Sequence, residues 1–528
     1  MKNRKYPFYE VSQISSVSDM LIRQAEKIPD HIAFRYRKGR DGIEEKTYKA
    51  VHDEVRRVSS WVSETYGKGT HIAIIGENSY EWLVAFFAVL TSGNVAVPID
   101  KELPAEEVAW LIDRADVKAV FISKTYSDLV EGIAGLEILT LKKLQDMTGT
   151  NAADYQLYEP QRDELACIFF TSGTSGRSKG VMLSHGNLAS EIYGPCRLFD
   201  PEGHSTLSVL PFHHTFGLNV AILMAYHYGV TIFLNKSLKR VKEDLQLAKP
   251  DVLLLVPMFV EVCYKQIMDG IRTGGREKKV KTGIRLCRLL SLIGIDKRRS
   301  MFQEILDVFG GNLKWIICGG AHLEPFYVKE LRNFGIEILN GYGTTECSPC
   351  VAINRNYFHK DGSVGQMLEE MQVRISSEGE VQVKGPVTMM GYYKDPEGTA
   401  EVLRDGWYST GDLGYVDEEG FLFLTGRAKN LIILSNGENI SPEELENGFQ
   451  IDPGVNEVLV YEKDHKIIAE IYPEEAFMGN TEYFNALMAK VNKGRPVYKQ
   501  VAGVVLREEE FIKNSSKKIV RYKNIPKQ

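Results

Sequence analysis

Several features that define common protein classes are scarce in this sequence of 528 residues. Its seven cysteines are an odd number scattered along the chain, which argues against a disulfide framework. Lys and Arg number 64 against 70 Asp and Glu, so the net charge of -6 gives no electrostatic basis for binding nucleic acid. Long apolar runs are also missing, because Ser-Gly-Asn or Pro interrupts the most apolar stretches, Trp82–Pro98 and Val252–Val260. We therefore expect no transmembrane segment.

The N-terminal residues, Met1–Glu10, begin with basic side chains but have no apolar core of the kind that a signal peptide needs. Together with the cysteine usage, this predicts a cytoplasmic protein. An apolar content of 44% and a charged content of 25% are typical of soluble globular proteins. At about 150 residues per domain, the length predicts three or four compact units.

Apolar, β-rich runs alternate with amphipathic stretches through the first two-thirds of the chain. The predicted strands are His71–Ile75, Asn94–Pro98, Val117–Ile122, Val252–Val256 and Trp315–Cys318, and the predicted helices are Ser79–Thr91 and Ala105–Ala115. This alternation predicts an α/β fold with parallel-type sheets flanked by helices. In such folds ligands bind beyond the carboxyl ends of the strands, and Gly319, Gly320 and Ala321 directly follow one of them.

The pattern changes after about residue 370, where short strands are separated by turns. We expect a large N-terminal domain over residues 1–428, which includes a β-rich subdomain at about 365–428. Residues 429–528 then predict a small α+β domain that contains a hairpin, a helix from Pro442, two strands and a second helix at 481–491. We place the boundary near Lys429.

A segment rich in glycine and hydroxyl side chains, Thr171–Gly180, lies directly behind the apolar run Leu165–Phe170. Glycines let backbone N–H groups approach an anion, hydroxyls donate further hydrogen bonds, and Lys179 adds a cation, so the segment predicts a phosphate-binding loop. Gly180 stands where a P-loop needs its magnesium-binding hydroxyl, which argues against a Walker NTPase. A solvated Gly/Ser turn is the alternative interpretation of this segment taken alone.

Two further motifs combine glycine with chemically useful side chains. Asn340–Pro349 follows a predicted strand, and we expect a tight Gly-x-Gly turn there that brings an aromatic ring, two hydroxyls and Glu346 to one strand end. A loop with a capping glutamate is the alternative. In Tyr408–Gly414 the carboxylate of Asp412 stands between glycines and suits both hydroxyls of a ribose. Arg427 follows with a forked cation.

These motifs, together with the run from Arg427 to Glu446, resemble in order and separation the core motifs of the adenylate-forming (AMP-binding) superfamily. The resemblance covers nearly the whole chain. That superfamily contains acyl-CoA synthetases, adenylation domains of peptide synthetases and luciferases. Val209–Gly217 and Glu346–Pro349 most resemble bacterial medium- and long-chain fatty acyl-CoA synthetases. The resemblance implies an AMP-forming acid–thiol ligase. Such an enzyme uses ATP to convert a carboxylic acid, here expected to be a fatty acid, into acyl-AMP and then transfers the acyl group to CoA.

The resemblance also implies which residues carry the reaction. Glu346 would hold Mg2+, and the implied catalytic residues are Lys518, Glu346, Thr171 and His214. The implied nucleotide and thiol contacts are Thr171, Ser172, Gly173, Thr174, Ser175, Gly176, Lys179, Gly319, Gly320, Ala321, Gly341, Tyr342, Gly343, Thr344, Asp412, Arg427, Lys429 and Gly437. His214 would gate the acyl pocket, although His213 stands beside it and a core histidine is the alternative.

The last motif of the family resembles Phe511–Arg521, where alignment on the Ile-x-Arg ending gives Lys518 the role of bridging the attacking carboxylate and the α-phosphate. This match is irregular, because Ile512, Asn514 and Lys517 replace the proline, threonine and glycine that the family usually has. In the family the small domain is mobile and rotates about the position of Lys429. The rotation would present the hairpin with Gly437 to the pantetheine arm.

Some alternatives stay open at this point. One alternative is that the acyl acceptor is the phosphopantetheine of a carrier protein instead of CoA. Another is that the reaction stops at acyl-AMP, and a third is that the chain is a non-catalytic ATP-binding relative. Ile271–Arg299 carries ten Lys or Arg against two acidic residues, which fits a peripheral membrane helix, a site for an acidic carrier, or a solvated basic face. Cys347 and Cys350 form a CxxC pattern that we interpret as two reduced thiols rather than a redox or zinc pair.

Overall fold

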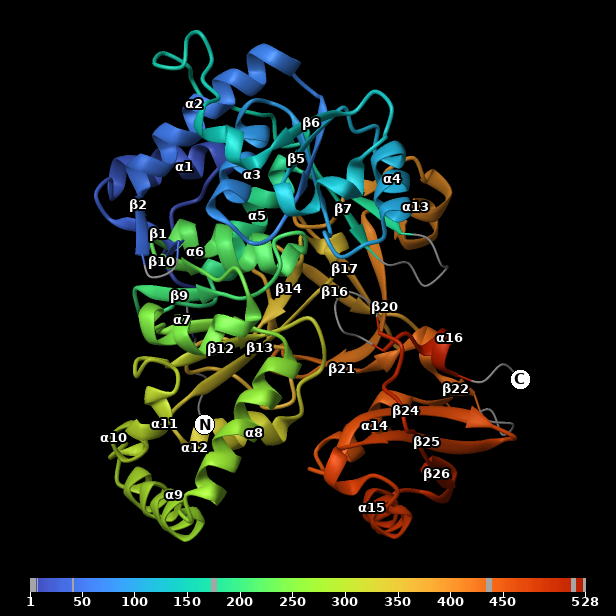
Figure 1. Ribbon diagram of the computed structural model, residues 1–528. Helices are drawn as coiled ribbons and strands as arrows, with labels where there is room; N and C mark the ends of the chain where they lie inside the picture. Colours follow the sequence, from blue (N-terminus) through green and yellow to red (C-terminus); the bar gives the residue numbers. More distant parts are fainter. Residues whose placement is uncertain are drawn as a thin grey trace. The chain divides into compact units, whose positions relative to one another are not determined.

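A computed structural model of the chain describes residues 6, 8–39, 42–171, 178–433, 439–513 and 519–525 (Figure 1). The chain divides into two compact units. Unit 1 comprises Met1–Val373, Val383–Tyr408 and Gly420–Leu422, and unit 2 comprises Arg374–Gln382, Ser409–Glu419 and Phe423–Gln528.

Unit 1 contains a seven-stranded sheet with the order β18-β8-β7-β4-β3-β5-β6. Its strands are β3 (His71–Ile75), β4 (Val95–Ile99), β5 (Ala119–Ile122), β6 (Glu137–Thr140), β7 (Leu165–Thr171), β8 (Lys179–Ser184) and β18 (Gly391–Tyr392). The five strands from β7 to β6 run parallel, whereas β8 and β18 add an antiparallel edge. The parallel strands are apolar along their length because both faces of such a sheet are covered.

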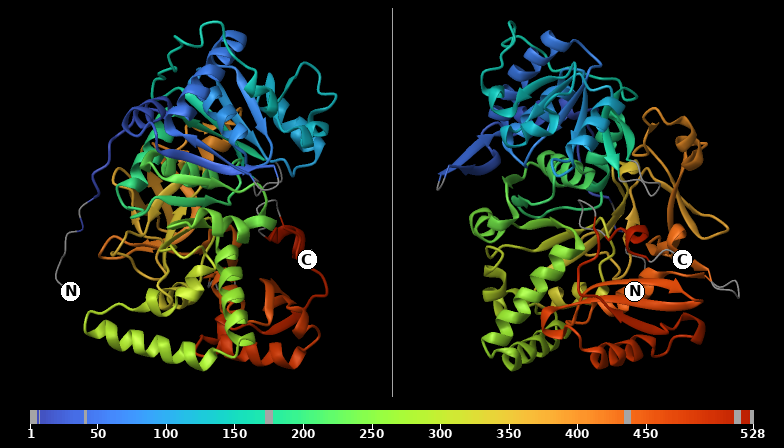
Figure 2. Two further views of the ribbon diagram at one scale, coloured as in Figure 1. Left: turned by 60° about the vertical axis from the view of Figure 1, so that its left-hand side comes forward. Right: turned by 45° about the vertical axis from the view of Figure 1, so that its right-hand side comes forward.

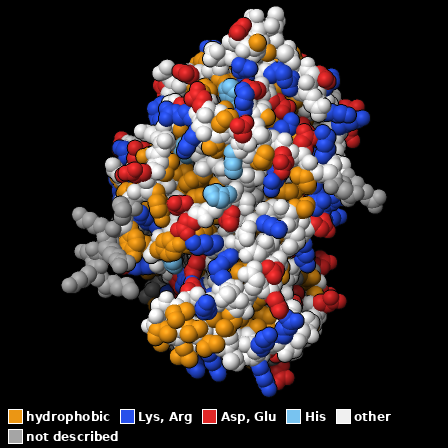
Figure 3. Space-filling view, turned by 90° about the vertical axis from the view of Figure 1, so that its left-hand side faces the viewer, with side chains coloured by type: hydrophobic (Ala, Val, Ile, Leu, Met, Phe, Trp, Pro, Cys, Tyr) orange, Lys and Arg blue, Asp and Glu red, His pale blue; other side chains and the backbone are white. Residues whose placement is uncertain are grey.

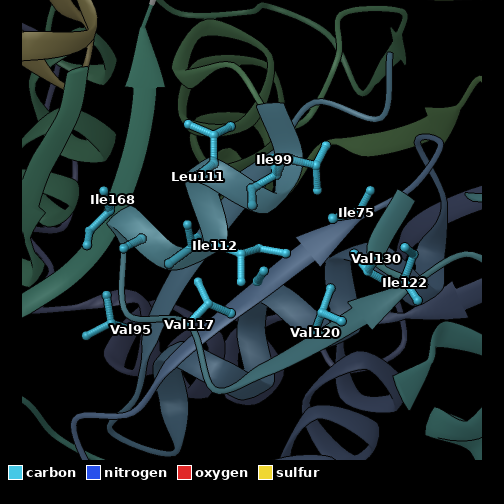
Figure 4. Packing of buried hydrophobic residues seen from close by; sticks show 14 residues of the cluster. Ile75, Val95, Ile99, Leu111, Ile112, Val117, Val120, Ile122, Val130 and Ile168 are labelled. Atoms are coloured by element: carbon cyan, nitrogen blue, oxygen red, sulfur yellow. The ribbon is translucent and has the colours of Figure 1, made fainter. Parts of the chain in front are cut away.

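The core on one face of this sheet lies under α4 (Ala105–Arg114). Leu111 and Ile112 of this helix pack among side chains of the parallel strands, including Ile75, Ile99 and Val120 (Figure 4). All five are buried. Burying an aliphatic side chain contributes about 1.5–3 kcal/mol, so this packing holds the strand ends in place for the residues that follow them.

A second sheet of unit 1 has nine strands in the order β15-β14-β13-β12-β11-β9-β10-β1-β2. They are β1 (Ile32–Lys38), β2 (Gly42–Thr47), β9 (Ser205–Ser208), β10 (Thr231–Leu234), β11 (Val252–Leu255), β12 (Trp315–Cys318), β13 (Glu337–Gly343), β14 (Cys350–Ile353) and β15 (Gln366–Met367). The six strands from β13 to β1 run parallel, and the flanking strands run antiparallel.

Helices cover these sheets. They are α1 (Val17–Lys27), α2 (Tyr48–Tyr66), α3 (Tyr80–Thr91), α5 (His185–Cys196), the π-helix η3 (Phe216–Met224), α6 (Ala225–Tyr228), α7 (Val241–Ala248), α8 (Pro257–Thr273), α9 (Glu277–Leu292), α10 (Arg298–Met301), α11 (Gln303–Asp307), α12 (Pro325–Asn333) and α13 (Pro396–Val402). Figure 2 shows α8 and α9 meeting at an angle. α5 begins with a capping box of Ser184 and Asn187. In the described part of the chain, no helix is both long and apolar enough to cross a membrane.

A five-stranded sheet follows, made of β16 (Gln372–Ile375), β17 (Glu380–Lys384), β19 (Leu403–Arg404), β20 (Trp407–Val416) and β21 (Leu422–Arg427). Strands of this sheet are shared between the two units. Unit 2 also contains the pair β22 (Ile432–Ile433) and β23 (Asn439–Ile440), the three-stranded sheet β24 (Val455–Lys463), β25 (Lys466–Pro473) and β26 (Gly503–Leu506), and the helices α14 (Pro442–Gln450), α15 (Thr481–Asn492) and α16 (Arg521–Asn524). Leu445 and Phe449 of α14 and Phe484 of α15 pack on this sheet.

The predicted α/β class with parallel sheets is confirmed. The strands and helices predicted between His71 and Cys318 are present within two residues of their expected bounds, whereas the strand before Asn340 is longer than expected. The prediction of a tight Gly-x-Gly turn at Gly341–Gly343 is wrong. β13 continues through Gly343, because Gly341 and Tyr342 pair with Ile353 and Ala352 of β14. The domain boundary near Lys429 and the mobility of the small domain stay predictions.

Candidate active site

The glycine- and hydroxyl-rich segment connects the antiparallel strands β7 and β8. Thr171 is the last residue of β7 and pairs directly with Lys179, the first residue of β8. The loop proper is therefore shorter than the sequence pattern predicts. Its predicted phosphate contacts Ser172, Gly173, Thr174, Ser175 and Gly176 lie outside the described residues. What the hairpin does establish is that Thr171 and Lys179 stand side by side at its base.

Lys179 and Glu346 are joined through a tyrosine that the motif analysis did not single out. Lys179 Nζ lies 4.5 Å from the centroid of the Tyr392 ring, within the range of a cation–π interaction. Tyr392 Oη donates a hydrogen bond of 2.9 Å to Glu346 Oε1. Burial and the Glu346 carboxylate raise the pKa of Tyr392 well above its usual range, so its hydroxyl stays protonated. The lysine predicted to contact phosphate and the predicted metal ligand thus belong to one cluster.

Strand pairing brings Tyr392 to this cluster. β18 adds to the edge of the seven-stranded sheet, where Tyr392 pairs with Val181 and Gly391 pairs with Met182. Gly391 has a φ of 140°, a backbone conformation that favours glycine. The ring of Tyr392 is only 6% exposed, so water does not readily replace its hydroxyl.

Glu346 lies on the short 3-10 helix η5 (Thr345–Cys347), between β13 and β14. Its backbone carbonyl accepts a hydrogen bond of 2.8 Å from Met389 N, which anchors η5 to the chain just before β18. Among the described residues, no hydrogen-bond partner is present for Glu346 Oε2. The half-buried carboxylate therefore offers one fixed oxygen and one that is available to a cation.

Two glycine motifs meet at the carboxyl ends of β12 and β13. A Cβ atom at Gly319 would lie 3.6 Å from the carbonyl oxygen of Gly341, so the two backbones are neighbours. Gly320 has a φ of 85°, and its nearest neighbour would be 3.5 Å away, so its conformation rather than crowding requires glycine. Gly320 and Ala321 are exposed. This is the edge at which ligands bind in open α/β sheets.

Gly343 is required for a different reason. A Cβ atom there would lie 1.9 Å from the carbonyl oxygen of Pro349, and Thr344 N donates a hydrogen bond of 3.0 Å to that same oxygen. The glycine therefore permits the return of the chain around η5. Two polar atoms of this motif, Asn340 Oδ1 and Thr344 Oγ1, are buried without a hydrogen-bond partner among the described residues, which fits a polar ligand.

His214 follows β9 and precedes the π-helix η3. Its ring lies 4.3 Å from that of His213, centroid to centroid. His213 Nε2 lies 3.4 Å from Asp100 Oδ2, and burial lowers the pKa of His213 although Asp100 opposes this. Both histidines are half-buried. Asn78 holds the segment by bonding the backbone of Leu210 and Phe212.

The segment that carries His214 is fastened to the Glu346 motif at two points. Thr215 Oγ1 lies 3.5 Å from Thr345 Oγ1, and Asn219 Nδ2 donates a hydrogen bond of 2.7 Å to the carbonyl oxygen of Ser348. The ring of Phe216 also lies 3.4 Å from the Cβ position of Gly319. π-Helical turns are frequent at functional sites, and this one places an apolar wall beside both motifs.

The CxxC pair is buried beside this motif and both thiols are free. Burial raises the pKa of Cys347 and of Cys350, so neither is a thiolate near neutral pH. Cys350 N donates to the carboxyl group of Glu191, whose burial raises its pKa well above the usual range. No group of three or more metal-ligating side chains is found among the described residues. The interpretation as two reduced thiols stays a prediction.

In unit 2, Asp412 lies on β20 and is 5% exposed. Arg427 Nε at the end of β21 lies 2.8 Å from Asp412 Oδ1, so the two predicted nucleotide residues form an ion pair. The adjacent Gly411 has a φ of 72°, and its N–H donates to Glu380 Oε1 over 2.8 Å. The Thr410 hydroxyl donates a hydrogen bond of 2.7 Å to the carbonyl oxygen of Val381. The sheet therefore fixes the carboxylate in a defined position.

The remaining predicted residues lie in the rest of unit 2. Lys429 is exposed on the 3-10 helix η6 (Ala428–Asn430). Gly437 and Lys518 lie outside the described residues. The residues that flank the segment with Lys518 are anchored, because Lys513 and Ile519 form a β-bridge and Arg521 pairs with the half-buried Glu446. Burial raises the pKa of Glu446 to about 7, although Arg521 opposes this shift.

Comparison with known proteins decides the family. The model of a family described as AMP-binding enzyme matches residues 21–393. The chain belongs to the AMP-binding enzyme family. All the described site residues of unit 1, Tyr392 included, fall within the matched range.

Relatives of known name span most of the chain. The long-chain-fatty-acid–CoA ligase FadD15 of Mycobacterium bovis is 28% identical over 489 residues, which cover 86% of this chain and 81% of the relative. Long-chain-fatty-acid–CoA ligase 5 of Rattus norvegicus is 27% identical over 517 residues, which cover 87% and 75%. Both exceed the range of the family match, so the similarity continues into unit 2.

Solved structures share the fold. The anthranilate CoA ligase AuaEII in complex with anthranoyl-AMP matches with a TM-score of 0.80 at 18% identity, over 99% of this chain and 98% of the other. The o-succinylbenzoate CoA synthetase of Bacillus subtilis, with its acyl-adenylate intermediate, gives a TM-score of 0.77 at 22% identity and covers 96% and 98%. This fold is therefore that of the adenylate-forming enzymes.

The sequence reasoning missed Tyr392 and Asn219, which hold Glu346 and the backbone beside it. The Gly-Tyr-Tyr sequence from Gly391 is the one local signal for the first. Nothing local marks Asn219 within its apolar helix. Tyr226 and His227 on α6 belong to the core, since Tyr226 is fully buried against Tyr48 and the backbone carbonyl of His227 accepts a hydrogen bond from Gln24.

Proposed function

We propose that this enzyme is an AMP-forming fatty acid–CoA ligase. It activates a fatty acid with ATP to the acyl-adenylate, releases pyrophosphate and transfers the acyl group to the thiol of CoA. The observation that carries the proposal is the Lys179–Tyr392–Glu346 cluster, which puts a phosphate-loop cation and a carboxylate with an available oxygen at one place. The two long-chain-fatty-acid–CoA ligases that align over most of the chain support the substrate class.

The carboxylate attacks a polyphosphate that carries the same charge, and two unit charges about 4 Å apart repel by about 4 kcal/mol at an effective dielectric constant of 20. Lys179 reduces this repulsion at the β- and γ-phosphates. Glu346 fits Mg2+, because hard cations prefer oxygen ligands and Mg2+ is usually bound through one or two carboxylates plus phosphates. When bound, Mg2+ would neutralise phosphate charge.

The other residues have roles in binding and transfer. Gly319 to Ala321 and Gly341 to Thr344 line the adenine, and Asp412 accepts the ribose hydroxyls, oriented by its ion pair with Arg427. His214 gates the acyl pocket beside the apolar wall that η3 forms. Lys518 supplies the cation between the attacking carboxylate and the α-phosphate. The small domain then turns about Lys429, and Gly437 allows close approach of the pantetheine arm.

A panel of carboxylic acids of increasing alkyl length, with an aryl acid for comparison, tests the proposal in a pyrophosphate-release assay. The purified protein is incubated with ATP and Mg2+, with and without CoA. We expect release that depends on a fatty acid, acyl-CoA as the product, and loss of both in Glu346→Gln. No release with any acid would refute the proposal. A thioester that forms on holo-carrier protein and not on CoA would establish the alternative acceptor.

A further inference from the structure

The helix α9 and the turn that follows it expose an unusual number of large apolar side chains. Leu289 is 63% exposed, Leu292 is 82% exposed and Ile293 is 70% exposed. The same surface continues through two further apolar side chains, Leu286 at 45% and Ile295 at 42% exposure. We call these five residues the α9 patch. Hydrophobic side chains gather on the lower end of the face shown in Figure 3, where α9 lies.

The α9 patch lies on a different face of the helix from the one that packs on the protein. Cys287 is buried, and Gly283 and Ile284 are half-buried, so the helix has a separate face that packs on the protein. Leu286, Leu289 and Ile293 recur at intervals of three and four residues on the opposite side, as one exposed stripe. Exposed apolar groups gathered in this way mark an interaction surface.

The charges around the patch are of one sign. Residues 278–295 contain five Lys or Arg and no Asp or Glu, although the whole chain carries a net charge of -6. Lys278, Lys279, Lys281 and Arg285 are exposed, and no ion pair or side-chain hydrogen bond is present for any of them within the described residues. These cations are available to an anionic partner.

A neighbouring hollow does not account for this charge. A cavity of about 480 Å3 lies beside the inner edge of α9 and is lined by Arg298 and Arg332. Arg298 pairs with Asp296 and Glu337, and Arg332 pairs with Glu337 and Asp361. The carboxylates of the protein already satisfy these arginines, so the hollow is not an anion site. The cations without such partners lie on the exposed side of the helix.

We propose that α9 docks this enzyme on the surface of an anionic lipid bilayer. The α9 patch enters the boundary between headgroups and acyl chains, and Lys278, Lys281 and Arg285 contact the lipid phosphates. An exposed helix with large apolar side chains and a flank of Lys and Arg is the arrangement that lies in a membrane interface. A protein partner would need a complementary groove, whereas a bilayer accommodates protruding leucines without one. This proposal does not depend on the identity of the acyl substrate.

Vesicle sedimentation tests the proposal with the full-length protein. We expect the protein to sediment with vesicles that contain phosphatidylglycerol, less with vesicles of phosphatidylcholine alone, and less at high salt. Each cation near an anionic surface contributes about fivefold to binding. The variant Lys278→Gln/Lys281→Gln/Arg285→Gln should therefore lose about a hundredfold on anionic vesicles. Burying one leucine is worth about tenfold or more, so Leu289→Ser/Leu292→Ser should lose about a hundredfold on vesicles of either kind.

Matched controls separate this site from a general surface effect. Val497 is 85% exposed in unit 2, so Val497→Ser removes a comparable apolar side chain, and Lys490→Gln removes an exposed lysine elsewhere. Both should bind like the wild type. As a direct readout, brominated lipids should quench the fluorescence of the introduced tryptophan in Leu289→Trp and should not quench it in Val497→Trp.

Three outcomes would overturn the proposal. The first is wild-type protein that stays in the supernatant with anionic vesicles. The second is equal binding by the wild type and the two α9 variants. The third is a dimer, or a complex with an acidic carrier protein, that the Leu289→Ser/Leu292→Ser variant abolishes while vesicle binding is absent in the wild type.

Discussion

The hydroxyl of Tyr392 provides a sharp test of the candidate site. Tyr392→Phe removes the donor to Glu346 Oε1 and keeps the ring against which Lys179 Nζ lies. A hydrogen bond to a charged group contributes about 1.5–3 kcal/mol. Glu346 is only half-buried, so water compensates in part and the lower half of that range applies. We therefore expect acid-dependent ATP–pyrophosphate exchange to fall by about ten- to fortyfold.

The dependence on Mg2+ distinguishes this role from a loss of stability. If Tyr392 orients Glu346 for the metal, Tyr392→Phe should need a higher Mg2+ concentration for half-maximal exchange and should keep the melting temperature of the wild type. Tyr393→Phe is the matched control. The Tyr393 hydroxyl also donates to a carboxylate, Asp116 Oδ2 at 2.6 Å, but at an exposed position. We expect that variant to exchange like the wild type.

Tyr392→Leu should lower exchange further, because it also removes the ring beneath Lys179, whose cation–π contact contributes about 0.5–2 kcal/mol. Equal exchange rates and an unchanged Mg2+ dependence in Tyr392→Phe would refute the reasoning. Such a result would mean that the contact between Tyr392 and Glu346 has no part in catalysis.

Three further predictions concern other parts of the chain. Gly343→Ala should destabilise the protein by about 2–3 kcal/mol in thermal or urea denaturation, because its Cβ would lie 1.9 Å from the carbonyl oxygen of Pro349. Gly341→Ala is the control and should not destabilise the protein, because the nearest atom to its Cβ would be 3.5 Å away. Similar stabilities of the two variants would contradict this prediction. Burial lowers the pKa of His185 to about 4. As the pH falls, His185 is therefore protonated at a higher pH in the unfolded chain than in the folded protein. The free energy of unfolding should be highest above about pH 6.5 and should fall by about 3 kcal/mol towards pH 4. In urea titrations, His185→Gln should reduce this loss. Lys518→Ala should abolish pyrophosphate exchange and should leave thiolysis of supplied acyl-adenylate unchanged, with Lys517→Ala as the control. Unimpaired exchange in Lys518→Ala would refute the assignment.

Local patterns predicted the elements of this fold well. β12 and, after His71, β3 are continuous apolar runs with the predicted bounds, since strands covered on both faces need no polar alternation. The error at Gly341–Gly343 has a physical reason. A Gly-x-Gly sequence suits a turn, but here the partner strand β14 supplies backbone hydrogen bonds that keep it extended. Pairing with a strand that comes later in the chain overrode the local preference.

The sequence by itself determined the chemistry that is available: the hydroxyls and Lys179 of the hairpin, the carboxylates of Glu346 and Asp412, and the order of motifs that marks the family. Only the tertiary structure decided which of these groups meet. Tyr392 reaches Glu346 because β18 adds to the far edge of β8, and Asp412 meets Arg427 because β20 pairs with β21. Such contacts depend on strand pairing between distant segments, whose geometry is set by the packing of the whole sheet and is not encoded in any local run of residues.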